Sequence, residues 1–428
     1  MTTSLRVAVV GSGPAGFYAT AHLLKLTDLT VSVDMFDRLP TPFGLVRAGV
    51  APDHPKIKSV TRVFDKTATD PRFRFFGHVE IGRDVSVDEL ATAYDAVIYA
   101  QGADRGKRAG IPGEQLAGNY SANAIVGWYN GHPDYRGLEI DMSGSRAVVI
   151  GTGNVALDVA RMLALPPAAL AATDIAEHAL ESLRHSNIDE IVVLGRRGPE
   201  QAAFTEPELE ELGQLIGVDV VVDPDDLPIS QRDDPRGRLA MLAEYATRKP
   251  TPGNKRIVLK FHTRPVEAVG ESAVATLRVE RQGEIFELAA SLVVHAVGYV
   301  GSPLHGVPFD AERGIICNDG GRVTGQPGIY VAGWIKRGPT GVIGTNKACA
   351  HQTVDALASD ARAGLLPVGS PIGRDALQRR LSEGCATDFA GWRAIDEHER
   401  NRGQLHGRPR IKVTRVSELV DIAGTASR

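Results

Sequence analysis

Cysteine is scarce in this chain of 428 residues, which has three, at Cys317, Cys349 and Cys385. They lie far apart and form no C-x-x-C pair. This spacing argues against an enzyme that reduces disulfides through two neighbouring thiols. It also provides no ligand set for an iron–sulfur cluster, and no metal site is predicted. An odd number of scattered cysteines fits a reducing compartment better than a secreted disulfide framework.

Long apolar runs and an excess of one charge are missing as well. No segment approaches the roughly 18 consecutive apolar residues of a membrane span, and a strand pattern from Leu5 leaves no room for a signal sequence. The net charge is −4, which gives no reason to expect nucleic acid or an acidic membrane as partner. We therefore expect a cytoplasmic protein without membrane insertion, long enough for two domains.

The first ordered stretch, residues 5–16, joins an apolar run to glycines in the spacing G-x-G-x-x-G. Gly11 permits a tight turn, Gly13 leaves no side chain between backbone and a pyrophosphate, and Gly16 lets the following helix pack on the strand. The next apolar strand ends at Asp37, where a carboxylate can take ribose hydroxyls. Together these features predict a dinucleotide site.

The same strand–turn–helix pattern recurs at Gly151 and Gly153, with Ala156 in the third position. This alanine is a variation often met in NADP-binding versions of the motif. Arg196 and Arg197 follow the next strand, where an NAD-binding protein usually has an acid. Two guanidinium groups match a phosphate and favour NADPH over NADH, although such a pair can also be a solvated strand edge.

Residues 39–55 contain four prolines and two glycines, so they cannot form a regular helix or a central strand. The stretch also carries apolar side chains that need a surface to pack on. It is either a surface connection or a loop that covers a flat cofactor. Its His54 can titrate near neutral pH, but a lone histidine is more often a hydrogen-bonded structural residue.

A helix is predicted to begin after Thr205, an N-cap residue with Glu208 three positions later. This capping pattern is a sufficient structural reason for a glutamate at position 208, and Glu211 is predicted to be a solvated helix residue. The helical spacing of residues 56–69 predicts one helix, and residues 73–81 alternate like a strand.

Apolar runs at 94–102 and 292–298 each end at a glycine, which is typical of buried parallel strands. A third strand, glycine-rich turn and helix start occupy residues 328–344. The fold class predicted from this order is α/β, with two nucleotide-binding Rossmann-like domains.

With these stretches in view, the sequence closely resembles the adrenodoxin reductase family of NADPH:ferredoxin reductases, from Val7 to about Leu357. The resemblance rests on both glycine motifs, on the Pro-Phe-Gly-Leu-Val-Arg-Ala-Gly-Val-Ala-Pro-Asp-His-Pro segment 42–55, on residues 195–205, and on Gly-Trp-Ile-Lys-Arg-Gly-Pro-Thr-Gly-Val-Ile-Gly at 333–344. The segments 42–55 and 333–344 are highly specific.

The resemblance implies a fold of the glutathione-reductase and adrenodoxin-reductase type. Residues 1–103 and 329–428 would form the FAD-binding domain, with an NADP-binding domain, 104–328, inserted between them. The implied activity passes a hydride from NADPH to FAD and then single electrons to a separate acidic ferredoxin, which would supply a cytochrome P450 or similar system. Similar enzymes often act as monomers.

The resemblance also assigns residues to each cofactor. Besides Gly11, Gly13 and Gly16, the implied FAD contacts are Ala15, Asp37, Leu45, Ile81, Trp334, Gly341, Val342 and Ile343. Besides Gly151, the implied NADPH contacts are Gly153, Asn154, Val155, Arg196, Arg197, Glu208 and Gly341. His54 and Glu211 fall where similar enzymes have residues near the flavin and nicotinamide, which makes them the candidate catalytic pair.

Two positions depart from the family pattern. Gln101 stands where relatives commonly have threonine, so we expect a contact near the cofactor to differ there, and Asp37 stands where many have glutamate.

Docking of an acidic ferredoxin needs a basic patch, although such residues are often plain solvated surface. The candidates are Arg236, Arg238, Arg248, Lys249, Lys336 and Arg337. Two other functions stay open: an NADPH-dependent diaphorase or quinone reductase, and a non-catalytic sensor that binds FAD and NADPH.

Overall fold

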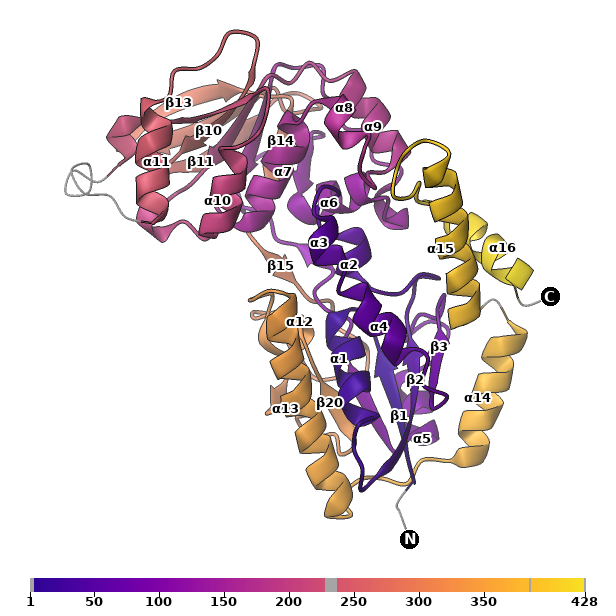
Figure 1. The fold of residues 1–428 in the computed structure, drawn as a ribbon. Helices are drawn as coiled ribbons and strands as arrows, with labels where there is room; N and C mark the ends of the chain where they lie inside the picture. The colour runs from indigo at the N-terminus through magenta and orange to yellow at the C-terminus, as the bar shows by residue number, and fades with distance from the viewer. Residues whose placement is uncertain (1–3, 228–236, 385, 427–428) are drawn as a thin grey trace.

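Two sheets organise the chain, one in each of the two lobes seen in Figure 1; the first is mostly parallel and the second wholly parallel. The computed structural model describes residues 4–227, 237–384 and 386–426. Among these residues, no helix has the length and apolar character needed to cross a membrane.

The sheet of the first lobe is built around β1 (Ser4–Val10), whose Val and Ala side chains are buried on both faces. Its strand order is β18-β19-β20-β4-β1-β2-β3, and the strands from β20 to β3 run parallel. The other strands are β2 (Thr30–Phe36), β3 (Phe73–Phe76), β4 (Ala96–Tyr99), β18 (Asn318–Asp319), β19 (Arg322–Val323) and β20 (Ile329–Val331). The C-terminal part of the chain therefore returns to the sheet that the N-terminal part begins.

The sheet of the second lobe has six parallel strands in the order β6-β14-β7-β8-β10-β9. These are β6 (Asn119–Ser121), β7 (Arg146–Ile150), β8 (Glu190–Leu194), β9 (Val218–Val222), β10 (Lys255–Lys260) and β14 (Leu292–His295). A small antiparallel sheet of β11 (Thr263–Val269), β12 (Thr276–Arg281) and β13 (Glu284–Ala289) covers one face. The domain boundaries at 103/104 and 328/329 stay a prediction. All strands of the six-stranded sheet fall between these boundaries. β18 and β19 also fall between them, but they belong to the sheet of the first lobe.

Helices cover the other sheet faces and give both lobes layered cores. In the first lobe, α1 (Pro14–Leu23), α4 (Thr61–Thr67) and α13 (Ile343–Arg362) lie on one face, and α5 (Val87–Ala93) and α14 (Pro371–Glu383) lie on the other. In the second lobe the covering helices are α6 (Ala122–Asn130), α7 (Asn154–Ala164), α8 (Pro167–Leu170), α9 (Glu177–Arg184), α10 (Glu206–Leu212) and α11 (Arg238–Thr247).

The proline-rich loop is packed into the first lobe. Phe43 and Val46 are buried, and the Phe43 ring meets Trp392 of α15 (Phe389–Gln404) edge to face at 5.5 Å. The loop contains the short helix α2 (Leu45–Ala48), from which Arg47 lies over the same indole, 5.2 Å from its centroid. The apolar side chains of this loop thus find a surface far away in the sequence.

Two predicted elements are shorter than expected. The helix predicted over 56–69 is split into α3 (Pro55–Lys58) and α4, because tighter bonds such as Val60 N–H to the Ile57 carbonyl (3.4 Å) interrupt it. The strand predicted over 73–81 ends at Phe76, since His78 has a φ of +60° that a strand does not accommodate.

A segment near the C-terminus ties the two lobes together. It runs from α15 to α16 (Val416–Ala426), and its buried Lys412 lies 3.3 Å from Asp174 in the second lobe. Lys58 of α3 contacts the other oxygen of Asp174 at 2.6 Å. Arg408 adds a bond of 3.1 Å to the carbonyl of Thr173. These contacts connect the C-terminal segment and α3 to the second lobe.

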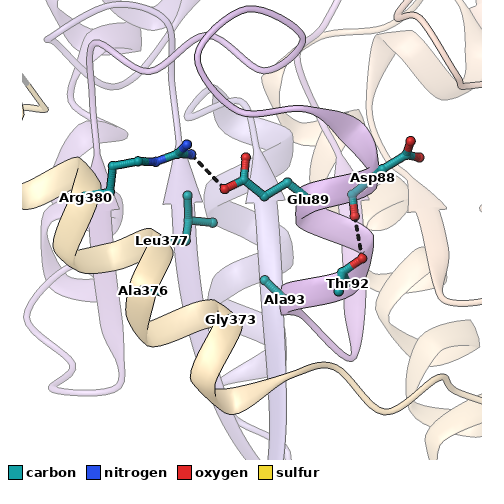
Figure 2. A pocket seen from close by; sticks show the side chains of 8 residues that line it. All are labelled: Asp88, Glu89, Thr92, Ala93, Gly373, Ala376, Leu377 and Arg380. Atoms are coloured by element: carbon teal, nitrogen blue, oxygen red, sulfur yellow. Dashed lines mark hydrogen bonds and ion pairs between the residues drawn. The ribbon is translucent and has the colours of Figure 1, made fainter.

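A groove of about 460 Å³ opens on the surface of the first lobe, between α5 and α14 (Figure 2). Glu89 and Arg380 span it with an ion pair of 2.8 Å. No predicted site residue lines this groove.

Candidate functional site

The first glycine turn has a side closed by packing and a side that is open. Gly11 has a φ of +104°, and a Cβ there would lie 2.6 Å from the carbonyl carbon of Ala100. A Cβ at Gly16 would lie 2.0 Å from the Gly11 oxygen. At Gly13, which precedes α1, an added Cβ would meet nothing within 4 Å. The turn itself therefore requires Gly11 and Gly16, whereas Gly13 leaves open space beside the N-terminus of α1.

Asp37 lies at the carboxyl end of β2, next to this turn. One carboxylate oxygen accepts the backbone N–H of Ser12 at 2.9 Å and its hydroxyl, and the other accepts the N–H of Leu39 at 3.0 Å. The carboxylate is therefore held in place by the turn that it faces. Of the apolar residues assigned to FAD, Ala15 and Ile81 are buried and Leu45 is half-buried.

The third glycine-rich turn lies between β20 and α13. Trp334 opens α12 (Trp334–Arg337), its ring 5.6 Å from that of Tyr299. Gly341 has a φ of +78° and precedes the N-terminus of α13, where Val342 is exposed and Ile343 half-buried. The indole N–H of Trp334 is buried without a hydrogen-bond partner in the described chain.

The Oε1 of Gln101 is a second buried polar atom for which the described residues provide no partner. It follows β4, the strand beside β20, with Ala332 N–H bonded to the Tyr99 carbonyl at 2.8 Å. Buried polar atoms without partners are rare in native proteins. Their presence at the ends of neighbouring strands fits a polar ligand at this sheet edge.

The second glycine turn repeats the pattern of the first. At Gly151, φ is +131° and a Cβ would lie 2.3 Å from the Ala296 oxygen, whereas a Cβ at Gly153 would meet nothing within 4 Å. Asn154 and Val155 start α7, and Asn154 Oδ1 accepts the N–H of Thr205 at 2.8 Å. The first turn of α7 is thereby joined to the start of α10.

Arg196 and Arg197 follow β8 and are both exposed. Neither guanidinium group has a hydrogen bond or an ion pair with the described part of the chain. Both remain available for an anion.

The capping pattern predicted for Glu208 is wrong. Thr205 occupies the N-cap position, but its side chain makes no capping bond and lies 3.5 Å from the Asn154 amide nitrogen. Glu208 faces Arg161 instead, with 3.6 Å between Oε2 and Nη1. A reason other than capping is therefore needed for this carboxylate.

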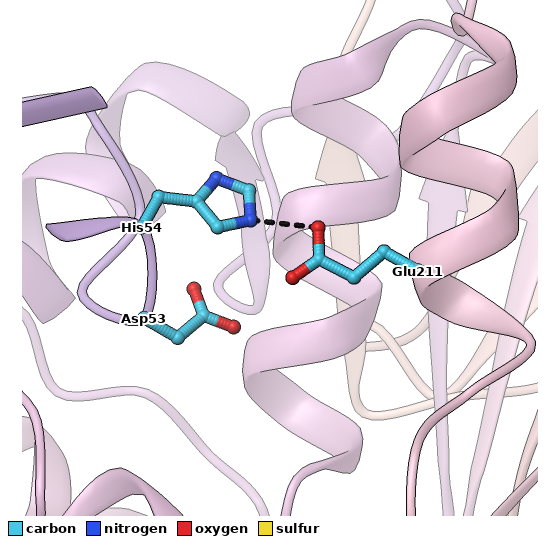
Figure 3. Close-up of side chains that lie close together, drawn as sticks. All are labelled: Asp53, His54 and Glu211. Carbon is cyan, nitrogen blue, oxygen red and sulfur yellow. Dashed lines mark hydrogen bonds and ion pairs between the residues drawn. The ribbon is translucent and has the colours of Figure 1, made fainter. Parts of the chain in front are cut away.

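His54 and Glu211, the two candidate catalytic residues, meet between the lobes (Figure 3). The imidazole Nε2 lies 2.9 Å from Oε2 of Glu211, and the two side chains are 11% and 41% exposed. His54 comes from the proline-rich loop and Glu211 from α10. A titratable pair thus lies where the first lobe contacts the second.

Comparisons with known proteins identify the family of this chain. Residues 5–192 match the family model described as pyridine nucleotide-disulphide oxidoreductase. The chain is 49% identical to NADPH-ferredoxin reductase FprA of Mycobacterium tuberculosis, over 97% of this chain and 98% of that protein. The chain belongs to the adrenodoxin reductase family of NADPH:ferredoxin reductases.

Other members of this family confirm the assignment. The mitochondrial NADPH:adrenodoxin oxidoreductase of Mus musculus is 42% identical, over 98% of this chain and 92% of that protein. The structure of M. tuberculosis FprA in complex with NADPH superimposes with a TM-score of 0.94 at 48% identity, covering 98% of this chain and 99% of that one. The predicted α/β class with Rossmann-like domains is confirmed.

The basic residues expected to dock a partner do not form one exposed patch in this reductase. Lys336 is buried, and its Nζ donates to Gln352 and Thr353 at 2.9 and 3.1 Å. Arg238 donates to backbone carbonyls, one of them that of Phe204 at 2.8 Å, and Arg337 donates to Asn346 at 3.0 Å. Arg248 and Lys249 are exposed, and Arg236 lies outside the described residues.

Sequence reasoning also missed a charged cluster beside the candidate pair of this reductase. Arg161 of α7 is fully buried, and its guanidinium group bonds Asp53 and Asp158. Burial raises the pKa of Asp158 to about 6, against the opposing effect of Arg161. The only signal in the sequence was an arginine on the same helix face as the apolar residues that follow the second glycine motif.

Proposed function

We propose that this protein is a flavoenzyme that passes electrons from NADPH through FAD to a separate, acidic ferredoxin. The observation that carries the proposal is the contact between His54 and Glu211 at 2.9 Å. It joins the lobe with the first glycine turn to the lobe with the second. Two nucleotides bound at these turns can approach each other at this boundary.

The residues of the first lobe fit FAD. Gly11 and Gly16 shape the turn, and open space at Gly13 beside the N-terminus of α1 suits a pyrophosphate. Asp37 is positioned for a ribose, and the unpartnered Trp334 N–H and Gln101 oxygen suit a polar ring system. The remaining proposed contacts are Ala15, Leu45, Ile81, Gly341, Val342 and Ile343.

The residues of the second lobe fit NADPH. Gly151 shapes the turn, the open side of Gly153 gives access to the N-terminus of α7, and the two exposed arginines suit the 2′-phosphate. Asn154, Val155, Glu208 and Gly341 complete the proposed contacts. The 1–103 and 329–428 segments would hold FAD, and 104–328 would hold NADPH.

A bound flavin accepts a hydride and can release its two electrons one at a time, which a nicotinamide cannot do. The chain provides electrostatics and geometry for this exchange. The N-terminus of α13, a helix of 20 residues, carries free N–H groups and positive potential. A flavin bound in front of this N-terminus would have the negative charge of its reduced ring stabilised. His54 can hold or pass a proton at Nε2, and the Glu211 carboxylate can accept an amide N–H.

The partner is proposed as a ferredoxin because the family acts on such proteins, and the protein is proposed to act as a cytoplasmic monomer. Cys317 and Cys349 are unpaired, so the described residues provide no disulfide for a thiol-exchange reaction. The pathway downstream of the ferredoxin stays a prediction from the resemblance.

The test is reduction of the purified holoprotein by NADPH without oxygen. NADPH should bleach the yellow colour, and an oxidised ferredoxin should restore it. Absence of bleaching would favour a non-catalytic sensor of FAD and NADPH. Bleaching reversed only by a quinone or a dye would favour a diaphorase.

A further inference from the structure

Arg161 connects parts of the candidate site that come from both lobes. Its side chain extends from α7 of the second lobe and is fully buried. Nε and Nη2 donate to the two oxygens of Asp53 at 2.7 and 3.1 Å, and Nη2 also donates to Asp158 at 2.7 Å. Asp53 belongs to the proline-rich loop and directly precedes His54. The two hydrogen bonds from Arg161 to the Asp53 carboxylate therefore hold the loop at the residue next to His54.

The third nitrogen of the guanidinium group faces α10. Nη1 lies 3.6 Å from Glu208 Oε2 and 3.8 Å from Glu211 Oε2, within ion-pair range but beyond hydrogen-bond distance. The same Glu211 oxygen contacts His54. Glu208 and Glu211 are one helical turn apart, where like charges repel each other. A buried cation between them offsets that repulsion.

We infer that Arg161 is a positioning residue, which holds His54 and Glu211 in register across the boundary between the lobes. This inference rests on the proposed function. Asp53 transmits the position of Arg161 to His54, and the charge of Arg161 keeps Glu211 directed toward the imidazole. Lysine would preserve the charge but lose the two-pronged bond to Asp53.

The first measurement is flavin reduction by NADPH in a stopped-flow instrument without oxygen. In Arg161→Gln we expect the limiting rate to fall about tenfold or more, with the half-saturating NADPH concentration changed less than about threefold. Arg161→Lys should recover part of the rate. The matched control is Arg408→Gln, which removes another buried arginine joining the lobes. Its limiting rate should stay within about twofold of the wild type.

A double-mutant cycle decides whether Arg161 acts through the candidate pair. In a Glu211→Gln background, Arg161→Gln should slow reduction less than about twofold further, because the group that it positions is already lost. Independent, multiplying effects would overturn the inference. Asp53→Asn should show the same lack of additivity, which keeps the test available if Arg161→Gln does not fold.

A readout without turnover complements the rates. NADP⁺ added to the oxidised holoprotein should perturb the flavin absorbance, and Arg161→Gln should alter that difference spectrum in the way Glu211→Gln does. An Arg161→Gln spectrum identical to that of Arg408→Gln would contradict the inference. If His54→Gln and Glu211→Gln both reduce at the wild-type rate, the proposed role of the pair fails instead.

Discussion

The substitution Gly153→Val separates the fold of the second glycine turn from its function. Gly153 has a φ of −99° and a ψ of 173°, an extended conformation that valine readily adopts. Because a Cβ would meet nothing within 4 Å, the main cost is the exchange of a glycine N-cap for valine, and the free energy of unfolding should fall by no more than about 1.5 kcal/mol. The valine methyl groups would, however, fill the space through which a phosphate reaches the N–H groups of α7.

The loss of two charge-assisted N–H bonds, at about 1.5 kcal/mol each, predicts about 3 kcal/mol of binding free energy. That corresponds to a dissociation constant for NADP⁺ raised roughly a hundredfold. A titration of the flavin absorbance with NADP⁺ measures it, and urea unfolding and the FAD content show whether the rest of the protein is intact.

The control Gly151→Ala should behave in the opposite way. Its φ of +131° and a Cβ 2.3 Å from the Ala296 oxygen make alanine a strained, clashing residue, so this variant should lose stability. If Gly153→Val stays folded and binds NADP⁺ as the wild type does, the turn is not a phosphate site. If Gly153→Val unfolds, the open space inferred at this position is wrong.

Three further perturbations have defined outcomes. Replacing both Arg196 and Arg197 by alanine should lower the preference for NADPH over NADH about tenfold to a hundredfold, measured as the ratio of kcat/KM values, because the two guanidinium groups have no partner among the described residues and are available for the 2′-phosphate; an unchanged ratio would remove them from the phosphate site. Asp174→Ala leaves the buried Lys412 ammonium, whose pKa burial already lowers, without its counter-ion; the free energy of unfolding in urea should fall by about 3 to 5 kcal/mol, and a loss below about 1 kcal/mol would contradict this. Burial lowers the pKa of His295 from 6.5 to about 4. As the pH falls, the unfolded chain therefore binds the proton before the folded chain does. The contribution of the neutral His295 to stability is full above about pH 6.5 and is lost between pH 6.5 and 4. At pH 5 the loss is about 2 kcal/mol, and urea unfolding of His295→Asn should show a flatter pH dependence than the wild type over this range.

Local patterns predicted the elements that depend on short stretches of chain. The turns at Gly11 and Gly151 require backbone angles that favour glycine, so the sequence marks them directly. Buried parallel strands such as β4 likewise appear as continuous apolar runs that end at a glycine.

The errors arose where one pattern has two structural outcomes. Helical spacing over residues 56–69 could not show that Ser59 donates its hydroxyl to the Lys56 carbonyl at 2.6 Å, at the point where the helix is interrupted. A Lys-Arg pair in a glycine-rich motif suggests exposed charge, yet Lys336 is buried because Gln352 and Thr353 of α13 solvate its ammonium group. Partners so far away in sequence leave no local trace.

The sequence by itself determined the two nucleotide-binding units, the preference for a phosphorylated nicotinamide cofactor and the family, since each follows from residues close together in the chain. The tertiary structure alone decided that His54 meets Glu211, 157 residues away, and that Arg161 is buried between Asp53 and the carboxylates of α10. The reason is physical. Backbone angles and apolar periodicity are local, whereas the burial of a charge is tolerated only where folding brings its counter-ions together.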